Sequence, residues 1–168
     1  MSAPIQIVDE QDRPVRAATK QEAWAQGLRH RIVRIMIVDG AGNVLLQHRS
    51  PTKDIYPNCW DNSAAGHVDV GEDYETAAAR ELEEEIGMHV PLDLMGTFAD
   101  ERTWNGLQMN TFVRVYTATI PGTTLPVTNE PDKIDDIRWF AIADVKRMID
   151  EHPEQVTDGL KKAIDRFF

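Results

Sequence analysis

The stretch GHVDVGEDYETAAARELEEEIGM, residues 66–88, constrains this chain most, because it crowds carboxylates into what has the pattern of one amphipathic helix. Asp73 is a suitable N-cap residue, and Gly87 stands where a left-handed C-cap would end a helix of about four turns. Within that helix three glutamates are consecutive, at Glu83, Glu84 and Glu85. The chain must therefore fold so that a densely acidic helix is tolerated.

At about 100° per residue, Glu81, Glu84 and Glu85 fall on one face of this helix. Like charges at these spacings repel, so a purely structural helix gains nothing from them. A hard divalent cation would gain, because carboxylate oxygens are its preferred ligands, and Arg80 can orient one of the carboxylates. The alternative is an ordinary solvated charged face. A neighbouring apolar stripe is expected to pack on a sheet: Ala79, Leu82 and Ile86.

The remaining pattern predicts a mixed sheet with a few helices, which is an α/β or α+β fold. Expected strands are 5–9, 32–39, 44–49, 96–104, 107–120 and 134–142, and expected helices are 21–28, 143–152 and 153–168. Asn105-Gly106 is the strongest short-range hairpin signal, between two of these strands. Pro153 is expected in the first turn of the last helix.

Length and composition favour one domain, residues 1–168, with 42% hydrophobic residues to build a core. No apolar run is long enough to span a bilayer and no signal-peptide pattern is present, so a cytoplasmic protein without membrane contact is expected. The net charge of −10 argues against stable nucleic-acid binding, but a bound cation could still admit a phosphate substrate. Cys59 is expected to pack as a small hydrophobe.

The spacing inside 66–88 then becomes informative. Gly66 is followed by five residues, Glu72 by seven, and Arg80 opens the run RELEEEIGM. This resembles the complete Nudix box, in which every fixed position is matched. The resemblance implies an α/β/α sandwich with a mixed central sheet and hydrolysis of a small-molecule diphosphate with Mg²⁺ or Mn²⁺.

The resemblance also implies roles for these positions. Glu81, Glu84 and Glu85 would hold the metal, and Glu84 is the first choice as the general base. Arg80 would act with them in the catalytic site. Support of the helix and its preceding loop falls to three further positions of the box: Gly66, Glu72 and Gly87.

Residues 27–73 resemble more narrowly the isopentenyl-diphosphate isomerase branch of the superfamily, which also contains hydrolases. There Arg49 and Lys53 match residues that hold the diphosphate, His67 matches a metal-ligand histidine, and His30 lies close to another. The position of the isomerase cysteine is Ala65, and the run LQMNTFV lacks the isomerase glutamates. These departures favour a hydrolase over an isomerase.

Two alternatives remain beside the hydrolase: an isopentenyl-diphosphate isomerase and a non-catalytic module that senses diphosphates or nucleotides. Specificity is expected from residues outside the box, and the candidates are Tyr56, Trp104, Asp100 and Glu101. Trp139 is expected to pack in a strand. The apolar stripe from Val156 to Ile164 would cover the sheet or contribute to a homodimer.

Overall fold

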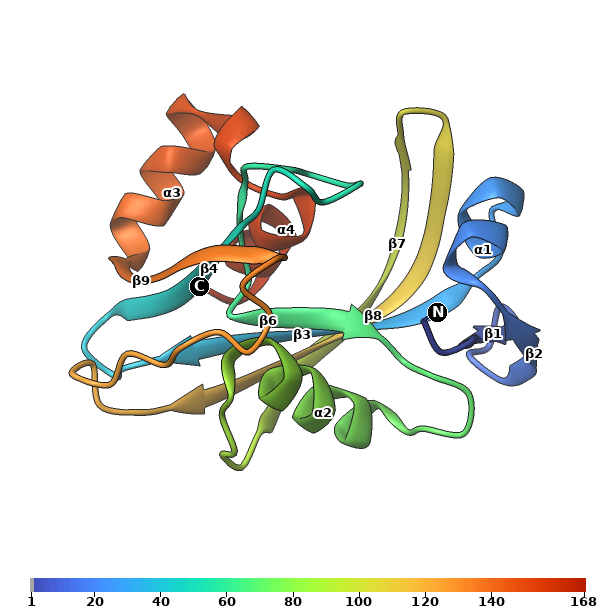
Figure 1. The fold of residues 1–168 in the computed structure, drawn as a ribbon, viewed down its shortest axis with the longest axis horizontal. Helices are drawn as coiled ribbons and strands as arrows, with labels where there is room; N and C mark the ends of the chain where they lie inside the picture. Colours follow the sequence, from blue (N-terminus) through green and yellow to red (C-terminus); the bar gives the residue numbers. More distant parts are fainter. Residues whose placement is uncertain (1) are drawn as a thin grey trace.

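The computed structural model describes residues 2–168, whose strands pair into one mixed sheet with helices on both faces (Figure 1). The strands are β1 Ile5–Val8, β2 Pro14–Ala18, β3 His30–Val38, β4 Asn43–Arg49, β5 Trp60–Asp61, β6 Ala64–His67, β7 Asp93–Trp104, β8 Leu107–Thr119 and β9 Ile134–Ala141. The helices are α1 Lys20–Gln26, α2 Tyr74–Ile86, α3 Ile142–Glu151 and α4 Asp158–Phe167, with a short 3₁₀ turn at Pro153–Gln155. None of these helices is long and apolar enough to cross a membrane.

Strand β3 organises the sheet. One edge pairs in parallel with β8 along its whole length, from His30 to Val38. The other edge is shared in turn by β1 at His30, by β6 at residues 32–35 and by β4 at residues 37–38, all antiparallel. Three different strands therefore share one edge of β3, and residues of both β6 and β4 line the cavity described below.

The side chains of β3 alternate between two apolar layers, as strand geometry requires. Val33, Ile35 and Ile37 pack with α2, whereas Met36 packs on the other face with the side chains of α3 and α4. Figure 1 shows the same arrangement, with α2 on one side of the sheet and α3 and α4 on the other. The expected α/β/α sandwich with a mixed sheet is therefore confirmed.

Helix α2 begins and ends where its capping residues predict. The Asp73 side chain accepts a hydrogen bond from the Thr76 N–H at 2.7 Å, and Gly87 closes the helix with φ +65°. The predicted apolar stripe was wrong at one position, because Ala79 is exposed. The apolar residues that the helix buries are Tyr74, Ala77, Ala78, Leu82 and Ile86.

The Asn105-Gly106 hairpin is also confirmed. Trp104 pairs with Leu107, which leaves a two-residue loop, and both loop residues have positive φ, +45° and +82°. A turn of this kind needs two positive φ values in succession, and Asn-Gly supplies them at least cost. The hairpin joins the two longest strands of the sheet, β7 and β8.

The C-terminal segment differs from expectation. Pro153 opens the separate 3₁₀ turn, and α4 begins only at Asp158. The Thr157 hydroxyl accepts a hydrogen bond from the Leu160 N–H at 3.1 Å, so Thr157 is the N-cap in place of a residue near Pro153. Val156 is extended and buried beside Trp60 before the helix starts. The short strands β2, β5 and β6 were not predicted.

Thr157 generates a stability prediction. Its hydroxyl both caps α4 and donates to Asp61 Oδ1 at 2.8 Å, and the residue is buried. Thr157→Ala should lower the free energy of unfolding by about 2 kcal/mol, because a cap and a buried bond to a carboxylate are lost together. Urea denaturation measures it. Thr157→Ser keeps the hydroxyl and should lose much less; equal losses would show that the methyl group matters instead.

Candidate active site

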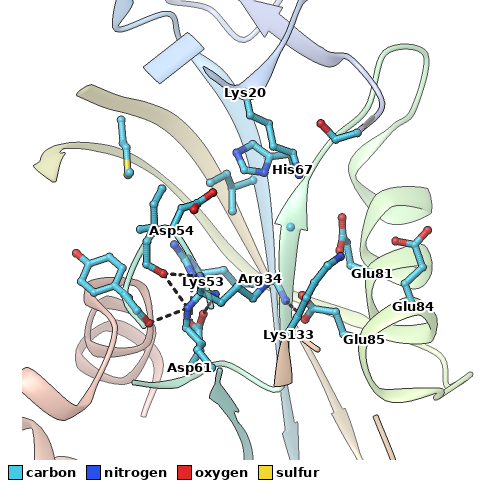
Figure 2. A pocket seen from close by; sticks show the side chains of 18 of the residues that line it. Lys20, Arg34, Lys53, Asp54, Asp61, His67, Glu81, Glu84, Glu85 and Lys133 are labelled. Atoms are coloured by element: carbon cyan, nitrogen blue, oxygen red, sulfur yellow. Dashed lines mark hydrogen bonds and ion pairs between the residues drawn. The ribbon is translucent and has the colours of Figure 1, made fainter. Parts of the chain in front are cut away.

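A single cavity of about 630 Å³ gathers most of the residues that the sequence singles out. It lies where β3 and β6 meet α2, and α1 and the loop after β4 complete its walls. Figure 2 shows Glu81, Glu84 and Glu85 on α2 at one side, with Lys53 and Asp61 across the cavity. The predicted residues that line it are His30, Arg49, Lys53, Tyr56, Gly66, His67, Arg80, Glu81, Glu84 and Glu85. Glu72 and Gly87 lie behind this lining.

Arg80 holds the acidic side of the cavity together. Its Nε donates to Glu72 Oε1 at 2.7 Å, and its Nη1 donates to Glu81 at 2.8 Å and to Glu84 at 3.2 Å. Its Nη2 reaches the His67 carbonyl oxygen at 3.0 Å, which ties α2 to β6. The hydrogen bonds that Arg80 donates to Glu72 and the charge of Glu81 raise the pKa of Arg80, so this cation is permanent. One guanidinium thus partly neutralises three carboxylates.

Gly66 leaves the space that Glu81 occupies. A Cβ atom built on Gly66 would lie 2.0 Å from Glu81 Cδ, far inside any permitted contact. The Glu81 carboxylate therefore lies directly against the backbone of β6. Burial, opposed by Arg80, raises the pKa of Glu81. The glycine of the box has a steric function here, because any larger residue would displace Glu81.

Glu85 is the deepest of the acids. Its Oε2 accepts hydrogen bonds from Gln47 Nε2 at 2.6 Å and from the Ala65 N–H at 3.0 Å, and the residue is 6% exposed. Burial, and then the charge of Glu81, raises the pKa of Glu85 to about 8. Both fixed hydrogen bonds use the same oxygen, which leaves the second oxygen for another partner. Two neighbouring buried carboxylates are costly unless a cation compensates them.

These three glutamates suit a hard divalent cation by chemistry. Carboxylate oxygens are the ligands that Mg²⁺ and Mn²⁺ prefer, and a cation would relieve the repulsion between Glu81 and Glu85. Within residues 2–168, no three acidic, histidine or cysteine side chains stand close enough to enclose a metal ion in their present positions. Arg80 accounts for part of this, since it holds both Glu81 and Glu84.

Arg49 and Lys53 line the side of the cavity opposite these acids, and we call this side the basic wall. Arg49 lines the cavity, but its guanidinium already donates to the Ile55 and Tyr56 carbonyl oxygens and to Asp61 Oδ2 at 3.2 Å. It therefore fixes the loop after β4 as well as lining the site. Burial, and then the charge of Arg49, lowers the pKa of Lys53, while Glu85 opposes this shift. Lys133, which the sequence analysis did not single out, lies between this wall and Glu85 (Figure 2).

His30 and His67 stack with ring centroids 5.3 Å apart, and Trp24 lies against His67 at 5.9 Å. His30 Nδ1 is 2.8 Å from the Leu28 carbonyl oxygen, so this nitrogen carries the proton that it donates. Burial lowers the pKa of both imidazoles, that of His67 well below its usual range. Both rings are therefore neutral at pH 7.

Of the remaining candidate residues, some line the cavity and others lie outside it. Tyr56 lines the cavity and its ring lies 4.0 Å from that of Trp104. Asp100 is buried against Lys162, and Glu101 pairs with Arg29, so neither acid lines the cavity. Cys59 is buried, with Sγ against the Pro57 and Glu154 carbonyl oxygens, and burial raises the pKa of its thiol. Trp139 packs partly against the core, as expected.

Two further arginines of the cavity, Arg34 and Arg102, were missed by the sequence analysis. Arg34 lies in the middle of the apolar run of β3 and is only 5% exposed. A charged residue is rarely buried in a central strand unless it has a specific partner. That rule could have identified Arg34 from the sequence, whereas Arg102, in a half-exposed strand, carries no such signal.

Comparison with known proteins agrees with this geometry. The family model described as the NUDIX domain matches residues 28–165. The chain belongs to the Nudix family. It is 34% identical over 152 residues to an uncharacterised Nudix hydrolase of Yersinia pestis, covering 88% of this chain and 78% of that protein. It is also 32% identical over 160 residues to an isopentenyl-diphosphate Delta-isomerase of Photorhabdus laumondii, covering 95% and 89%.

Comparison with solved structures supports the same family. A MutT Nudix hydrolase from Burkholderia pseudomallei matches with a TM-score of 0.66 and 26% identity, covering 83% of this chain and 98% of that one. A Deinococcus radiodurans protein matches with a TM-score of 0.82 over 98% of this chain and 99% of its own, at 23% identity. The chain is thus a Nudix hydrolase, a member of a family that hydrolyses diphosphate bonds in small molecules.

The raised pKa of Glu85 generates a pH prediction for the metal-free protein. The folded state keeps a proton up to about pH 8 that the unfolded state releases near pH 4.5, so this contribution to stability is lost as pH rises between those values. Glu85→Gln should therefore gain on the order of 2 kcal/mol relative to the wild type between about pH 5 and about pH 8. Urea denaturation with a chelator at both pH values measures it.

The exposed Glu83, on the same helix, provides the control for that experiment. Glu83→Gln should follow the pH dependence of the wild type, because it leaves the Glu85 carboxylate and its surroundings unchanged. A Glu85→Gln variant that also follows the wild type would show that Glu85 ionises normally in the folded protein.

Proposed function

We propose that this Nudix hydrolase uses Mg²⁺ or Mn²⁺ to hydrolyse the diphosphate bond of a nucleoside diphosphate derivative or another small organic diphosphate. The observation that supports this most directly is the division of one cavity into an acidic side on α2 and a basic side around Lys53. A metal-bound diphosphate needs both, because cations must neutralise its oxygens from more than one direction.

Glu81, Glu84 and Glu85 would hold the metal. When bound, such an ion neutralises phosphate charge and lowers the pKa of a coordinated water. Gly66 would keep the space for Glu81, and Glu72 would hold Arg80 in place. Gly87 would end the helix so that its acids stay in register. The whole chain, residues 1–168, would act as one domain.

Glu84 is the proposed general base. Its side chain is 51% exposed, compared with the enclosed Glu81 and the buried Glu85, so it can reach a water in the cavity. Among residues 2–168, the fixed partner of the Glu84 carboxylate is Arg80, at 3.2 Å. Burial raises the pKa of the two other acids, and neither of them is as open to a water in the cavity as Glu84 is.

Lys53 and Lys133 are the proposed ligands of the diphosphate. An ammonium on a flexible stem can follow the phosphates as the reaction proceeds. The Lys133 ammonium pairs with Glu130 at 2.6 Å near the rim of the cavity. The hydrogen bond to Glu130 and the charge of Glu85 raise the pKa of Lys133, so Lys133 and Glu85 are close to each other. Arg49 would act chiefly by holding the loop that carries Lys53, and His67 would contact the rest of the substrate.

The isomerase is a second candidate, because relatives with that name cover most of the chain. The structure gives little to support it. Ala65 presents only its backbone N–H to Glu85, and the β8 residue that reaches the cavity is Met109, which cannot transfer a proton. A non-catalytic sensor is the third candidate and would not require the acids of α2 to be intact.

The decisive test is a product screen with magnesium over nucleoside diphosphate sugars, dinucleotides, coenzyme A, nucleoside triphosphates and isoprenoid diphosphates. One class should be hydrolysed, and Glu84→Gln should lower kcat about a hundredfold or more, because the base is lost. Glu83→Gln, one residue away and exposed, should keep the wild-type rate. Chelation of the metal should abolish turnover in all three proteins.

The same screen separates the rivals. Isomerisation of an isoprenoid diphosphate without phosphate release would establish the isomerase. Binding without turnover of any compound would establish the sensor. A Glu84→Gln variant with full activity would transfer the role of base to another residue.

A further inference from the structure

The loop between β4 and β5, residues 50–59, has an unusual backbone conformation beside the cavity. Tyr56 has φ +51° and Asn58 has φ +58°, both in the left-handed region. A bulky residue rarely adopts this region, because its Cβ atom crowds the backbone. Such conformations persist where the surrounding structure enforces them, and they are concentrated at functional sites. The contacts that hold Tyr56 therefore point to a role for this residue.

The ring of Tyr56 contacts the β7–β8 hairpin. Its centroid lies 4.0 Å from the ring centroid of Trp104, the last residue of β7, and 5.6 Å from Arg102 Cζ. Arg102 and Trp104 are two residues apart on β7 and therefore share a face of the strand. In Figure 1 the loop extends from β4 toward this hairpin. We call Tyr56 and Trp104 the aromatic clasp, because they join these two segments.

The hairpin side of the aromatic clasp is fixed by two helices. The pairing of β3 with β8 stops before the hairpin tip, but there the Asn110 side chain donates to the carbonyl oxygen of Gly27, the C-cap of α1, at 2.8 Å. Arg102 donates through Nη1 to Asp158 Oδ2 at 3.2 Å, at the start of α4. The ring of Tyr56 therefore packs on a surface that is itself held in place.

Two other contacts hold the loop from the side of β4 and β9. The Arg49 guanidinium, on β4, donates to the Tyr56 carbonyl oxygen at 3.1 Å. The Thr52 hydroxyl donates to the carbonyl oxygen of Asp132, just before β9, at 2.9 Å. Lys53 lies between these two points in the sequence and lines the cavity. The aromatic clasp adds a contact with the hairpin, and so fixes the loop that carries Lys53 from a third direction.

We propose that Tyr56 is a positioning residue: its ring, packed on Trp104, holds the loop so that the Lys53 ammonium stays in the cavity, across from the acids of α2. This inference rests on the proposed function, in which Lys53 binds the diphosphate. The effect of Tyr56 reaches the phosphates through Lys53 and needs no contact between the tyrosine and the substrate. Because the ring makes the contact with Trp104, the phenol hydroxyl is dispensable.

The test is calorimetric binding of methylenediphosphonate in magnesium, because hydrolysis cannot remove this probe. Tyr56→Ala should weaken binding about tenfold, since Lys53 no longer donates to the phosphonate oxygens. Tyr56→Phe keeps the ring and should bind as the wild type does. Trp104→Ala removes the other half of the clasp and should match Tyr56→Ala. The double variant should lose no more than either single variant, because the two residues act through one contact.

A Lys53→Ala background separates positioning from a general loss of structure. There Tyr56→Ala should weaken binding by less than about twofold, because the group that it positions is already absent. A merely structural role would add its full loss in that background. The matched control is Phe112→Ala, which also removes an aromatic ring beside an arginine: Arg29 Cζ lies 5.2 Å from the Phe112 ring centroid, outside the cavity lining. This control should keep the wild-type affinity.

Tyr56→Gly separates the ring from the backbone. Glycine adopts positive φ without strain, so this variant tolerates the loop conformation and lacks the ring, and it should bind as weakly as Tyr56→Ala. Wild-type affinity in Tyr56→Gly, additive losses in the Lys53 background, or no binding of the probe by the wild type would overturn the inference. Failure of the proposed function is a different result, namely binding of the probe without hydrolysis of any compound in the product screen.

Discussion

The pairing of one arginine with three glutamates is the interaction on which this site depends. Arg80 contacts Glu72, Glu81 and Glu84 and also the His67 carbonyl oxygen, so it joins the acidic helix to the sheet. Without it, the carboxylates of α2 would repel one another with only the more distant Lys20 and Lys133 to compensate them. With it, the helix can present its acids toward the cavity and still pack its apolar side on β3. Gly66 completes this arrangement by letting Glu81 reach the backbone of β6. The helix, strand and loop of the box therefore depend on one another physically.

A second charged centre, Asp61, plays the corresponding role on the opposite wall. It accepts a hydrogen bond from Arg49 and from Thr157, and it lies 3.9 Å from Arg34. Burial raises its pKa, but the charges of Arg49 and Arg34 outweigh this, and the net shift is downward, so Asp61 stays ionised. Because Thr157 also caps α4, the position of the C-terminal helix is coupled to the basic wall of the cavity. The two walls thus each have one ion of opposite sign at their centre: Asp61, which is buried, and Arg80, which is half-buried.

The sequence predicts this molecule best where a local chemical rule decides the structure. Asp73 and Gly87 located both ends of α2, and Asn105-Gly106 located the hairpin, because capping and turn chemistry act within a few residues. The last helix was placed wrongly because Pro153 and Thr157 are both acceptable starts, and only Asp61, distant in the sequence, selects Thr157. The four residues of β6 show no alternation of apolar and polar side chains that would predict a strand. The strand forms because β3 has an edge with which it can pair. Arg102 was missed for a related reason, since strands that are distant in the sequence bring it to the cavity.

Charge distribution explains how a chain with a net charge of −10 can attract a diphosphate. The cavity is lined by as many basic as acidic side chains, so it is locally balanced although the whole surface is strongly negative. The balance is not uniform, because Glu81, Glu84 and Glu85 gather on α2, whereas Arg34 and Lys53 lie across the cavity beside Asp54 and Asp61 (Figure 2). An anion approaching alone would be repelled by α2, and a cation approaching alone by the basic wall. A diphosphate that arrives with its divalent cation meets the complementary charge on both sides. Under the proposed function, the geometry would favour the metal complex of the substrate over either component, and the general negative charge would help to exclude free polyanions.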